Sequence, residues 1–175
     1  MLVYHACSHV LEPGCALALK PNTHYEGMPF PTAERLLEQE RPIGCHSRLS
    51  SYFAARSPEQ ALVVKHGMAG SDGEAAREEI RVYAVEAEKA TPCPMILVQT
   101  VHVLLESGAE ACGRRVARAY WTSDQPWYFV ELLAPTLRVV RQIVMDRPFN
   151  IIWREVNDAY KGDKELALPL VRGLR

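Results

Sequence analysis

The sequence lacks the short motifs that most often indicate a nucleotide site or a reactive nucleophile. It contains neither G-x-G-x-x-G nor G-x-x-x-x-G-K-[ST], so the two common nucleotide-binding loops are absent. It contains no G-x-S-x-G, the motif of the serine nucleophile in many hydrolases. C-x-x-C is also missing, which removes the usual pattern of a structural zinc site.

Neither sign of charge dominates the chain. Its 175 residues include 20 basic and 21 acidic side chains, for a net charge of −1. Proteins that bind a nucleic-acid backbone usually carry a basic excess, so the composition gives that class no support, although it leaves a local basic groove open. The length is that of one domain, and a chain of this size can bury a sufficient hydrophobic core without disulfide bonds or bound metal ions. We therefore predict a single domain over residues 1–175.

Cysteines are few and irregularly spaced. The chain has five, an odd number that makes a poor disulfide framework. The opening residues MLVYHACSHV lack the basic start and long apolar run of a signal peptide. No run of about 18 apolar residues predicts a transmembrane helix. These absences predict reduced thiols, a cytoplasmic location and no membrane partner.

Strand-like segments dominate both ends of the chain, with helical segments between them. Side chains that favour extended structure predict strands at 1–7, 52–54, 80–88, 126–135 and 137–145. Strands and helices do not alternate regularly along the chain. This order predicts an α+β domain, in which helices flank an antiparallel sheet, rather than a doubly wound parallel sheet.

The predicted helices cover residues 31–40, 58–67 and 101–120. Thr32 is a candidate cap of the first helix, and Ser57 followed by Pro58 is a typical start of the second. Gly108 and Gly113 lower the helix propensity of the third predicted helix.

Three other segments have less regular patterns. Residues 22–31 read as a surface loop, and residues 67–79 read as a Gly-rich, charged connector. The segment 146–175 is mixed and forms a strand or a short helix in part. We expect it to dock on the domain as a C-terminal extension.

Two polar stretches and one isolated acid are candidate sites. In YHACSH, His5, Cys7 and His9 alternate along a strand and face one side, but no fourth ligand follows at a familiar spacing, so no metal site is predicted. His5 is then either a hydrogen-bonded sheet residue or a ligand contact. In SRLSSYFA, Arg48 with its neighbouring serines suits a phosphate, or else forms a polar loop before a strand.

Glu131 is the isolated acid, in the otherwise apolar run FVELLA. Burying an unpaired carboxylate costs several kcal/mol. Glu131 therefore either points outward from a half-exposed strand or lines a cleft in which its charge is needed.

Taken in order, several short motifs resemble the ADP-ribosyltransferase superfamily, in its His-Tyr-Glu class. VYHACS is similar to the family's first strand, and LEPG is similar to a turn of the rifampin-modifying enzymes. SSYFAARSPEQA resembles the middle motif, IRVYAVEAE a later strand, and VELLAPTLRVVRQI the last motif of the poly-ADP-ribose polymerases. The resemblance covers about residues 2–145 and implies a split antiparallel sheet around a cleft that binds NAD as a substrate.

The resemblance also assigns roles to residues. It implies that Glu131 is the catalytic carboxylate that faces the NAD ribose, and that His5 hydrogen-bonds the ribose of the adenosine side. Ala6 stands where the family has glycine, and Ser8 is displaced by one position from the family's hydroxyl residue.

The remaining cofactor-binding residues follow from the middle motif and from the segment before the last one. The resemblance implies that Arg48, Ser50 and Ser51 reach the pyrophosphate. The aromatic residue that stacks on nicotinamide is left open between Tyr4, Tyr52 and Tyr120, because the family's position for it corresponds to the neighbourhood of Val63.

The activity implied by the resemblance is transfer of ADP-ribose from NAD to an acceptor, which is a protein, a nucleic acid or a small molecule. By analogy of fold, such an enzyme acts as a bacterial toxin, a defence effector or a drug-modifying enzyme, with a neutralising protein as a further partner. Two alternatives stay open. One is a catalytically inactive module of the same fold that binds NAD, ADP-ribose or a partner protein, and the other is an unrelated α+β domain.

Overall fold

The computed structural model describes residues 1–18, 28–68 and 80–172. The helices are α1 (Pro31–Gln39), α2 (Pro58–Met68), α3 (Met95–Glu106), α4 (Glu110–Thr122) and α5 (Phe149–Arg172). The strands are β1 (Leu2–Cys7), β2 (Ala16–Ala18), β3 (Tyr52–Ala54), β4 (Arg81–Glu86), β5 (Thr91–Pro94), β6 (Val130–Ala134) and β7 (Thr136–Ile143). The loop predicted at 22–31 and the connector predicted at 67–79 lie mostly outside the described residues. The α+β class is confirmed.

The strands form a split antiparallel sheet, as predicted. One sheet has the order β1-β4-β7-β2, and the other has the order β3-β6-β5. The two strands β6 and β7 follow each other along the chain but belong to different sheets, with Pro135 between them. Proline has no N–H to donate to a ladder, so it is suited to the place where pairing changes partner. A backbone bridge between Tyr4 and Ala55 connects the two sheets.

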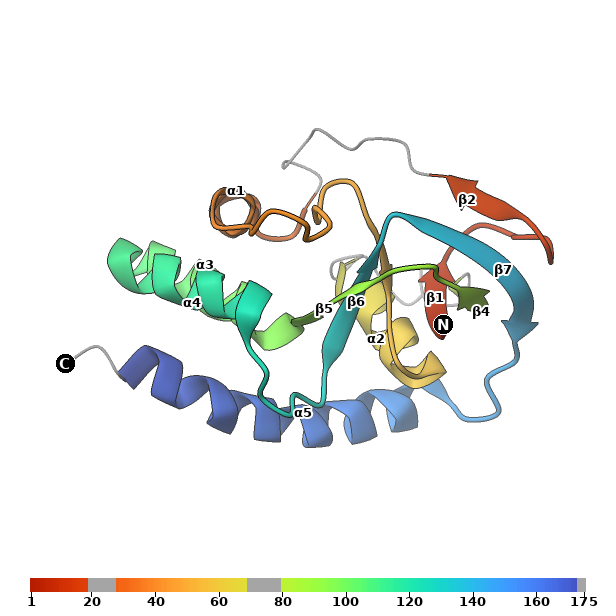
Figure 1. Cartoon of the computed structure of the whole chain (residues 1–175). Helices are drawn as coiled ribbons and strands as arrows, with labels where there is room; N and C mark the ends of the chain where they lie inside the picture. The colour runs from red at the N-terminus through yellow and green to blue at the C-terminus, as the bar shows by residue number, and fades with distance from the viewer. Residues whose placement is uncertain (19–27, 69–79, 173–175) are drawn as a thin grey trace.

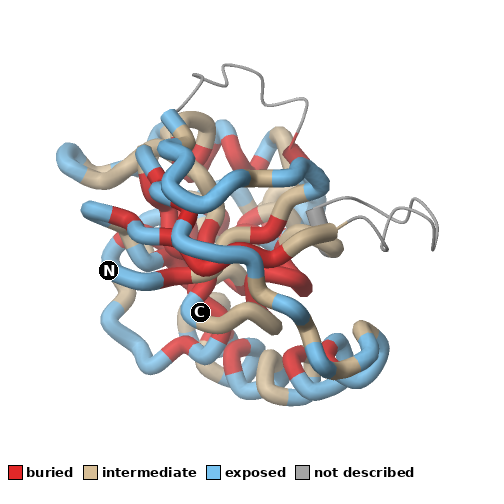
Figure 2. The backbone as a smooth tube through the Cα atoms, turned by 90° about the vertical axis from the view of Figure 1, so that its right-hand side faces the viewer, coloured by how far each residue is buried: buried red, intermediate tan, exposed pale blue. Residues whose placement is uncertain are grey.

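Burial differs between the two consecutive strands. In β7, the buried residues Leu137 and Val139 alternate with exposed neighbours, as in a strand with one face in solvent. In β6, all five residues are buried, including Glu131. Figure 2 shows the buried segments gathered in the interior of the molecule. Because β6 is covered on both faces, the carboxylate of Glu131 cannot point outward into solvent.

The helices pack around the split sheet in two groups. Helices α1, α3 and α4 contact one another on one side of β5 and β6, while α5 runs beneath the sheet and contacts α2, α3 and α4 (Figure 1). Helix α2 also packs on β1 and β4. Ser57 caps α2 as predicted, because its Oγ accepts the Gln60 N–H at 3.2 Å. Thr32 does not cap α1, which starts at Pro31 after Phe30 without a side-chain cap.

The helix predicted at 101–120 is in fact two helices. Gly108 has φ +75°, a left-handed conformation that glycine adopts without a steric penalty, and it ends α3 before α4 turns back. Gly113 then lets the helices approach closely, since a Cβ there would lie 3.3 Å from Leu105 Cδ2 and 3.4 Å from Leu36 Cδ2. The two glycines that weaken a single helix are therefore what this helical hairpin requires. The short strand β5 before α3 was not predicted.

The C-terminal segment forms the long helix α5 rather than a strand. Its residue Asp163 is 1% exposed, and its two carboxylate oxygens accept the N–H groups of Tyr128 at 2.7 Å and Phe129 at 2.8 Å. These two amides immediately precede β6, so α5 is tied to the strand that carries Glu131. Among the described helices, none combines the length and the apolar character that crossing a membrane requires.

Replacing Asp163 by alanine should destabilise the fold by about 2–4 kcal/mol, because one buried and one partly buried amide lose their acceptor. The free energy of unfolding from urea titration measures this change. The matched control is Asp158→Ala, since Asp158 is exposed on the same helix and pairs only with the exposed Lys161. Equal midpoints for both variants would show that Asp163 does not hold α5 to β6.

Candidate functional site

A buried arginine between two carboxylates forms the centre of the candidate site. The Nε and Nη2 atoms of Arg48 donate to the two oxygens of Glu34, at 2.5 and 2.9 Å. Its Nη1 donates to Oε1 of Glu131 and, at 2.6 Å, to the hydroxyl of Tyr120. The Tyr120 hydroxyl in turn donates to Glu131 Oε1 at 2.5 Å. We call these four residues, Glu34, Arg48, Tyr120 and Glu131, the Arg48 cluster.

Each member of the cluster comes from a different element. Glu34 lies in the first turn of α1, Tyr120 near the end of α4, Glu131 in β6, and Arg48 in the turn before β3. The backbone N–H of Arg48 donates to Glu38 Oε1 at 2.9 Å, which fastens this turn to α1. All four side chains are at most 4% exposed. The network therefore connects α1, α4, the turn before β3 and the central strand β6 of the triplet β3-β6-β5 inside the core.

Burial and charge set the protonation states in the cluster. Burial by itself lowers the pKa of the Arg48 guanidinium, but the oxygens of Tyr120 and Glu34 raise it, and the net pKa lies above the usual value. Burial raises the pKa of Tyr120 well above its usual value, although Arg48 partly opposes this shift. Burial also raises the pKa of Cys93 to about 12. These shifts favour a charged Arg48 and protonated side chains at Tyr120 and Cys93.

The Arg48 cluster lies beside a cavity of about 280 Å³. Glu34, Arg48 and Glu131 are the charged residues that line it. Four aromatic residues line it as well, which are Phe30, Phe129, Trp153 and Tyr160. We call this space the Glu131 cavity. Two of the lining residues, Gln99 and Trp153, are exposed. They mark the side on which the cavity opens to solvent.

The two oxygens of Glu131 differ in their contacts. Oε1 accepts hydrogen bonds from both Arg48 and Tyr120. Oε2 accepts none from the residues that the structure describes. A carboxylate held through one oxygen keeps a fixed orientation, and its other oxygen is left for a ligand in the cavity. The interpretation of Glu131 as a cleft-lining acid agrees with this geometry, and the outward-facing alternative does not.

His5 and Tyr52 form a separate group. The ring of His5 lies 5.7 Å from that of Tyr52, edge to face, and His5 Nδ1 is 2.8 Å from the carbonyl oxygen of Phe53. In β3, Tyr52 and Phe53 point to opposite faces. Phe53 is paired with Leu133, which shares its face with Glu131, so Tyr52 points away from Glu131. The structure therefore does not bring His5 and Tyr52 together with Glu131, and neither lines the Glu131 cavity.

The predicted site residues near His5 make contacts within the fold and lie away from the cavity. The side chain of Ala6 is 6% exposed and packs in a hydrophobic cluster with α2. Ser8 is exposed, and its carbonyl accepts a hydrogen bond from Arg81 at 2.9 Å. Neither residue lines the cavity. Tyr4, the other stacking candidate, packs against the same hydrophobic cluster as Ala6.

The serines around Arg48 shape the turn rather than the cavity. The backbone N–H of Ser50 donates to the Ser47 carbonyl at 3.3 Å, and Ser47 Oγ accepts the Leu49 N–H at 3.2 Å. The Ser51 hydroxyl is buried and has no hydrogen-bond partner among the described residues. Because the guanidinium of Arg48 is occupied by two carboxylates, the expected pyrophosphate contact of Arg48, Ser50 and Ser51 does not match this arrangement.

Sequence reasoning found three members of the cluster and missed Glu34. A signal for it exists, because Glu34 lies between Ala33 and the pair Leu36–Leu37, on the face of the helix that is otherwise apolar. The aromatic residues Trp153 and Tyr160 were also missed. Their segment gave no clear periodicity in the sequence, and they reach the cavity only because α5 is a long helix.

Comparisons with known proteins add no relative. A scan against models of protein families finds no match, and a search of curated proteins finds no related sequence. The described residues contain no group of three or more His, Cys, Asp or Glu side chains that could hold a metal ion. The geometry of the Glu131 cavity is therefore the basis for a functional proposal.

Replacing Arg48 by methionine should destabilise the protein by about 3–5 kcal/mol, because two buried carboxylates lose their counter-charge. Urea unfolding monitored by tryptophan fluorescence measures this loss. Arg118→Met is the matched control, since Arg118 is 67% exposed and pairs with Glu40 at the surface. A loss no larger than that of the control would show that the cluster does not depend on the guanidinium charge.

His5 should make stability depend on pH in a defined direction. Burial lowers its pKa from the ordinary value of 6.5, while the Phe53 carbonyl opposes and Lys65 adds to the shift. Below about pH 6.5 the unfolded state then binds a proton more readily than the folded state, so the free energy of unfolding falls as the pH falls. His5→Asn should lose less stability than the wild type between about pH 7.5 and about pH 5.5, as urea titrations would measure. Equal losses would remove His5 as the cause, since the other histidines are common to both proteins.

Proposed function

We propose that the protein transfers ADP-ribose from NAD to an acceptor and that Glu131 is the catalytic carboxylate. The observation that carries this proposal is Oε2 of Glu131, which belongs to a side chain 1% exposed, lines the cavity and accepts no hydrogen bond from the described residues. The resemblance of the sequence to the His-Tyr-Glu class of ADP-ribosyltransferases supports the same residue.

The chemistry requires such a group. The bond between the nicotinamide nitrogen and ribose C1′ breaks, and its electron pair leaves with nicotinamide. Positive charge then spreads over the ribose ring until the acceptor nucleophile bonds to C1′ and loses its proton. A fixed carboxylate beside the ring stabilises this charge as it forms, which lowers the barrier more than it strengthens ground-state binding.

The other cavity residues have supporting roles in this proposal. Arg48 and Tyr120 hold Oε1 of Glu131, so the carboxylate needs no reorganisation when charge develops. The aromatic side chains of Phe129 and Tyr160 offer an apolar surface for the nicotinamide ring. NAD as a whole is larger than the cavity, so we place its nicotinamide end inside and its adenosine end toward the opening near Trp153.

This proposal departs from the roles that the resemblance implies for His5 and Tyr52. Both lie on the opposite face of the strand triplet from Glu131. The proposed site therefore uses the glutamate of the family pattern without its histidine. The acceptor, whether protein, nucleic acid or small molecule, is not defined by the cavity.

A second candidate function is a binding module that does not cleave NAD. The observation that favours it is the ion pair itself, because Arg48 binds Glu131 and gives the carboxylate a structural role. In such a module, NAD or ADP-ribose would bind without turnover.

Glu131→Gln should slow nicotinamide release by about 10²–10³-fold and weaken NAD binding by no more than about 10-fold, because the charge that develops on the ribose loses more stabilisation than the bound ground state does. Release is measured by chromatography, first without an acceptor and then with cell lysate and labelled NAD. Glu165→Gln, the same change at an exposed position of α5, is the control. NAD binding without release by the wild type would favour the binding module, and no NAD binding would end both proposals.

A further inference from the structure

The Glu131 cavity is lined by more acidic than basic side chains. Two carboxylates, Glu34 and Glu131, and one guanidinium, Arg48, line the cavity, so its formal charge is −1 when both acids are ionised. All three side chains are at most 4% exposed, so bulk water screens this charge weakly. A buried charge without a partner is unfavourable, and a cation in the cavity would compensate for it.

The aromatic walls favour the same kind of ligand. Phe30, Phe129, Trp153 and Tyr160 line the cavity and come from three separate parts of the chain. Three of these rings make ring contacts, since Phe30 stacks on His102 at 4.6 Å and Phe129 meets Tyr160 edge to face at 5.5 Å. The faces of aromatic rings attract cations, most strongly where water is excluded.

The number of hydrogen-bond acceptors restricts the type of cation. Most of the lining residues are apolar, and apart from the charged residues only Gln99, Asn157 and Tyr160 bring side-chain oxygen atoms to the described lining. Oε2 of Glu131 is the oxygen of that carboxylate without a donor among the described residues. A primary ammonium has three N–H donors that would each need an acceptor. A quaternary nitrogen has none, and its charge is spread over apolar carbon atoms.

We infer that the Glu131 cavity binds an organic cation whose charged nitrogen carries no N–H, such as an N-alkylpyridinium or a quaternary ammonium group. This inference shares its cavity with the proposed function and, if both hold, makes the site selective for the oxidised, cationic nicotinamide ring. It does not require NAD cleavage, because charge and ring faces alone give the selectivity.

The test compares a cation with its neutral isostere. The pair is 1-methylnicotinamide and 3-methylbenzamide, which have the same shape and differ in the ring charge. Isothermal titration of the full chain should show the cation binding about 10-fold tighter or more. Glu131→Gln should abolish this preference, whereas Glu165→Gln should keep it. Equal affinity of the wild type for both compounds would overturn the inference.

A second pair and a second variant keep the test independent of how Glu131→Gln folds. Choline should bind more tightly than 3,3-dimethylbutan-1-ol, its neutral carbon isostere. Trp153 is 37% exposed, so Trp153→Leu should fold, and it should weaken binding of both cations by about 5-fold while changing the neutral compounds much less. An equal effect on cations and neutral compounds would show that the ring contributes apolar area alone, against the inference.

The two proposals fail in different ways. A preference for cations without nicotinamide release would contradict the proposed transfer of ADP-ribose and support the cation site. Release of nicotinamide without any preference for cations over isosteres would support the transferase and overturn the cation site.

Discussion

The guanidinium of Arg48 is the interaction on which the interior of this protein depends. It binds Glu34 through two nitrogens and Glu131 through the third, and so connects the first turn of α1 with the buried strand β6. Without it, two carboxylates at 1% exposure would be buried with no counter-charge. Buried ion pairs of this kind seldom stabilise a fold more than an apolar core would. Their presence is therefore better explained by the site that they create than by stability.

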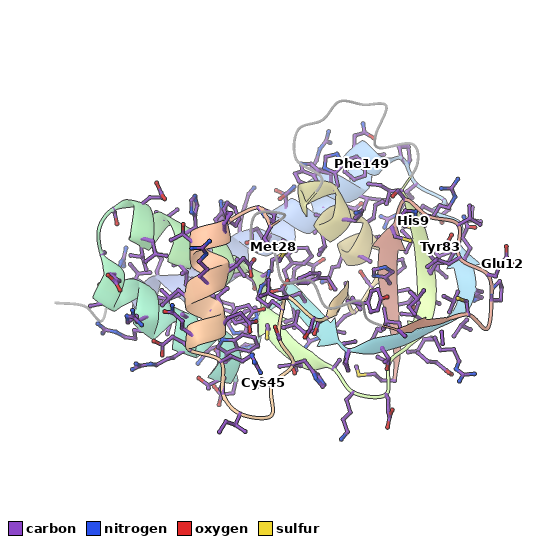
Figure 3. All side chains as sticks on the ribbon, turned by 90° about the horizontal axis from the view of Figure 1, so that it is seen from above. His9, Glu12, Met28, Cys45, Tyr83 and Phe149 are labelled. Atoms are coloured by element: carbon purple, nitrogen blue, oxygen red, sulfur yellow. The ribbon has the colours of Figure 1, made fainter. Side chains whose placement is uncertain are left out.

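Helix α5 connects this cluster with the opening of the cavity. Asp163 holds the amides of Tyr128 and Phe129, which precede β6. Phe129 and, two residues later, Glu131 line the cavity wall. The same helix contributes Trp153 and Tyr160. Figure 3 shows Phe149, at the start of α5, lying beside α2, where its ring packs at a tilt against His66 with the ring centroids 4.5 Å apart. Helix α5 therefore both holds the chain just before β6 and forms part of the cavity wall.

The strand triplet β3-β6-β5 separates two groups of polar residues that the sequence suggests as one. On one face lie Glu131 and the Arg48 cluster, and on the other lie His5 and Tyr52. Adjacent residues of β3 contact different groups, because Tyr52 meets His5 while the ring of Phe53 lies 5.0 Å from the Arg48 guanidinium. The proposed chemistry therefore depends on a carboxylate, a guanidinium and a phenol on one face, and the cation site depends on the aromatic rings around them.

The sequence by itself determined the local features of this protein. Runs of β-branched and aromatic residues predicted most of the strands, and Ser57 predicted the start of α2. The lone acid in FVELLA indicated that Glu131 either faces solvent or lines a cleft. These features depend on backbone preference and periodicity over a few residues. The tertiary structure decided which side chains meet, because the partners of Arg48 lie 14, 72 and 83 residues away along the chain. It also decided that His5 lies apart from Glu131, since a shift of one residue in a strand changes the face, and only the pairing of β3 with β6 sets that register.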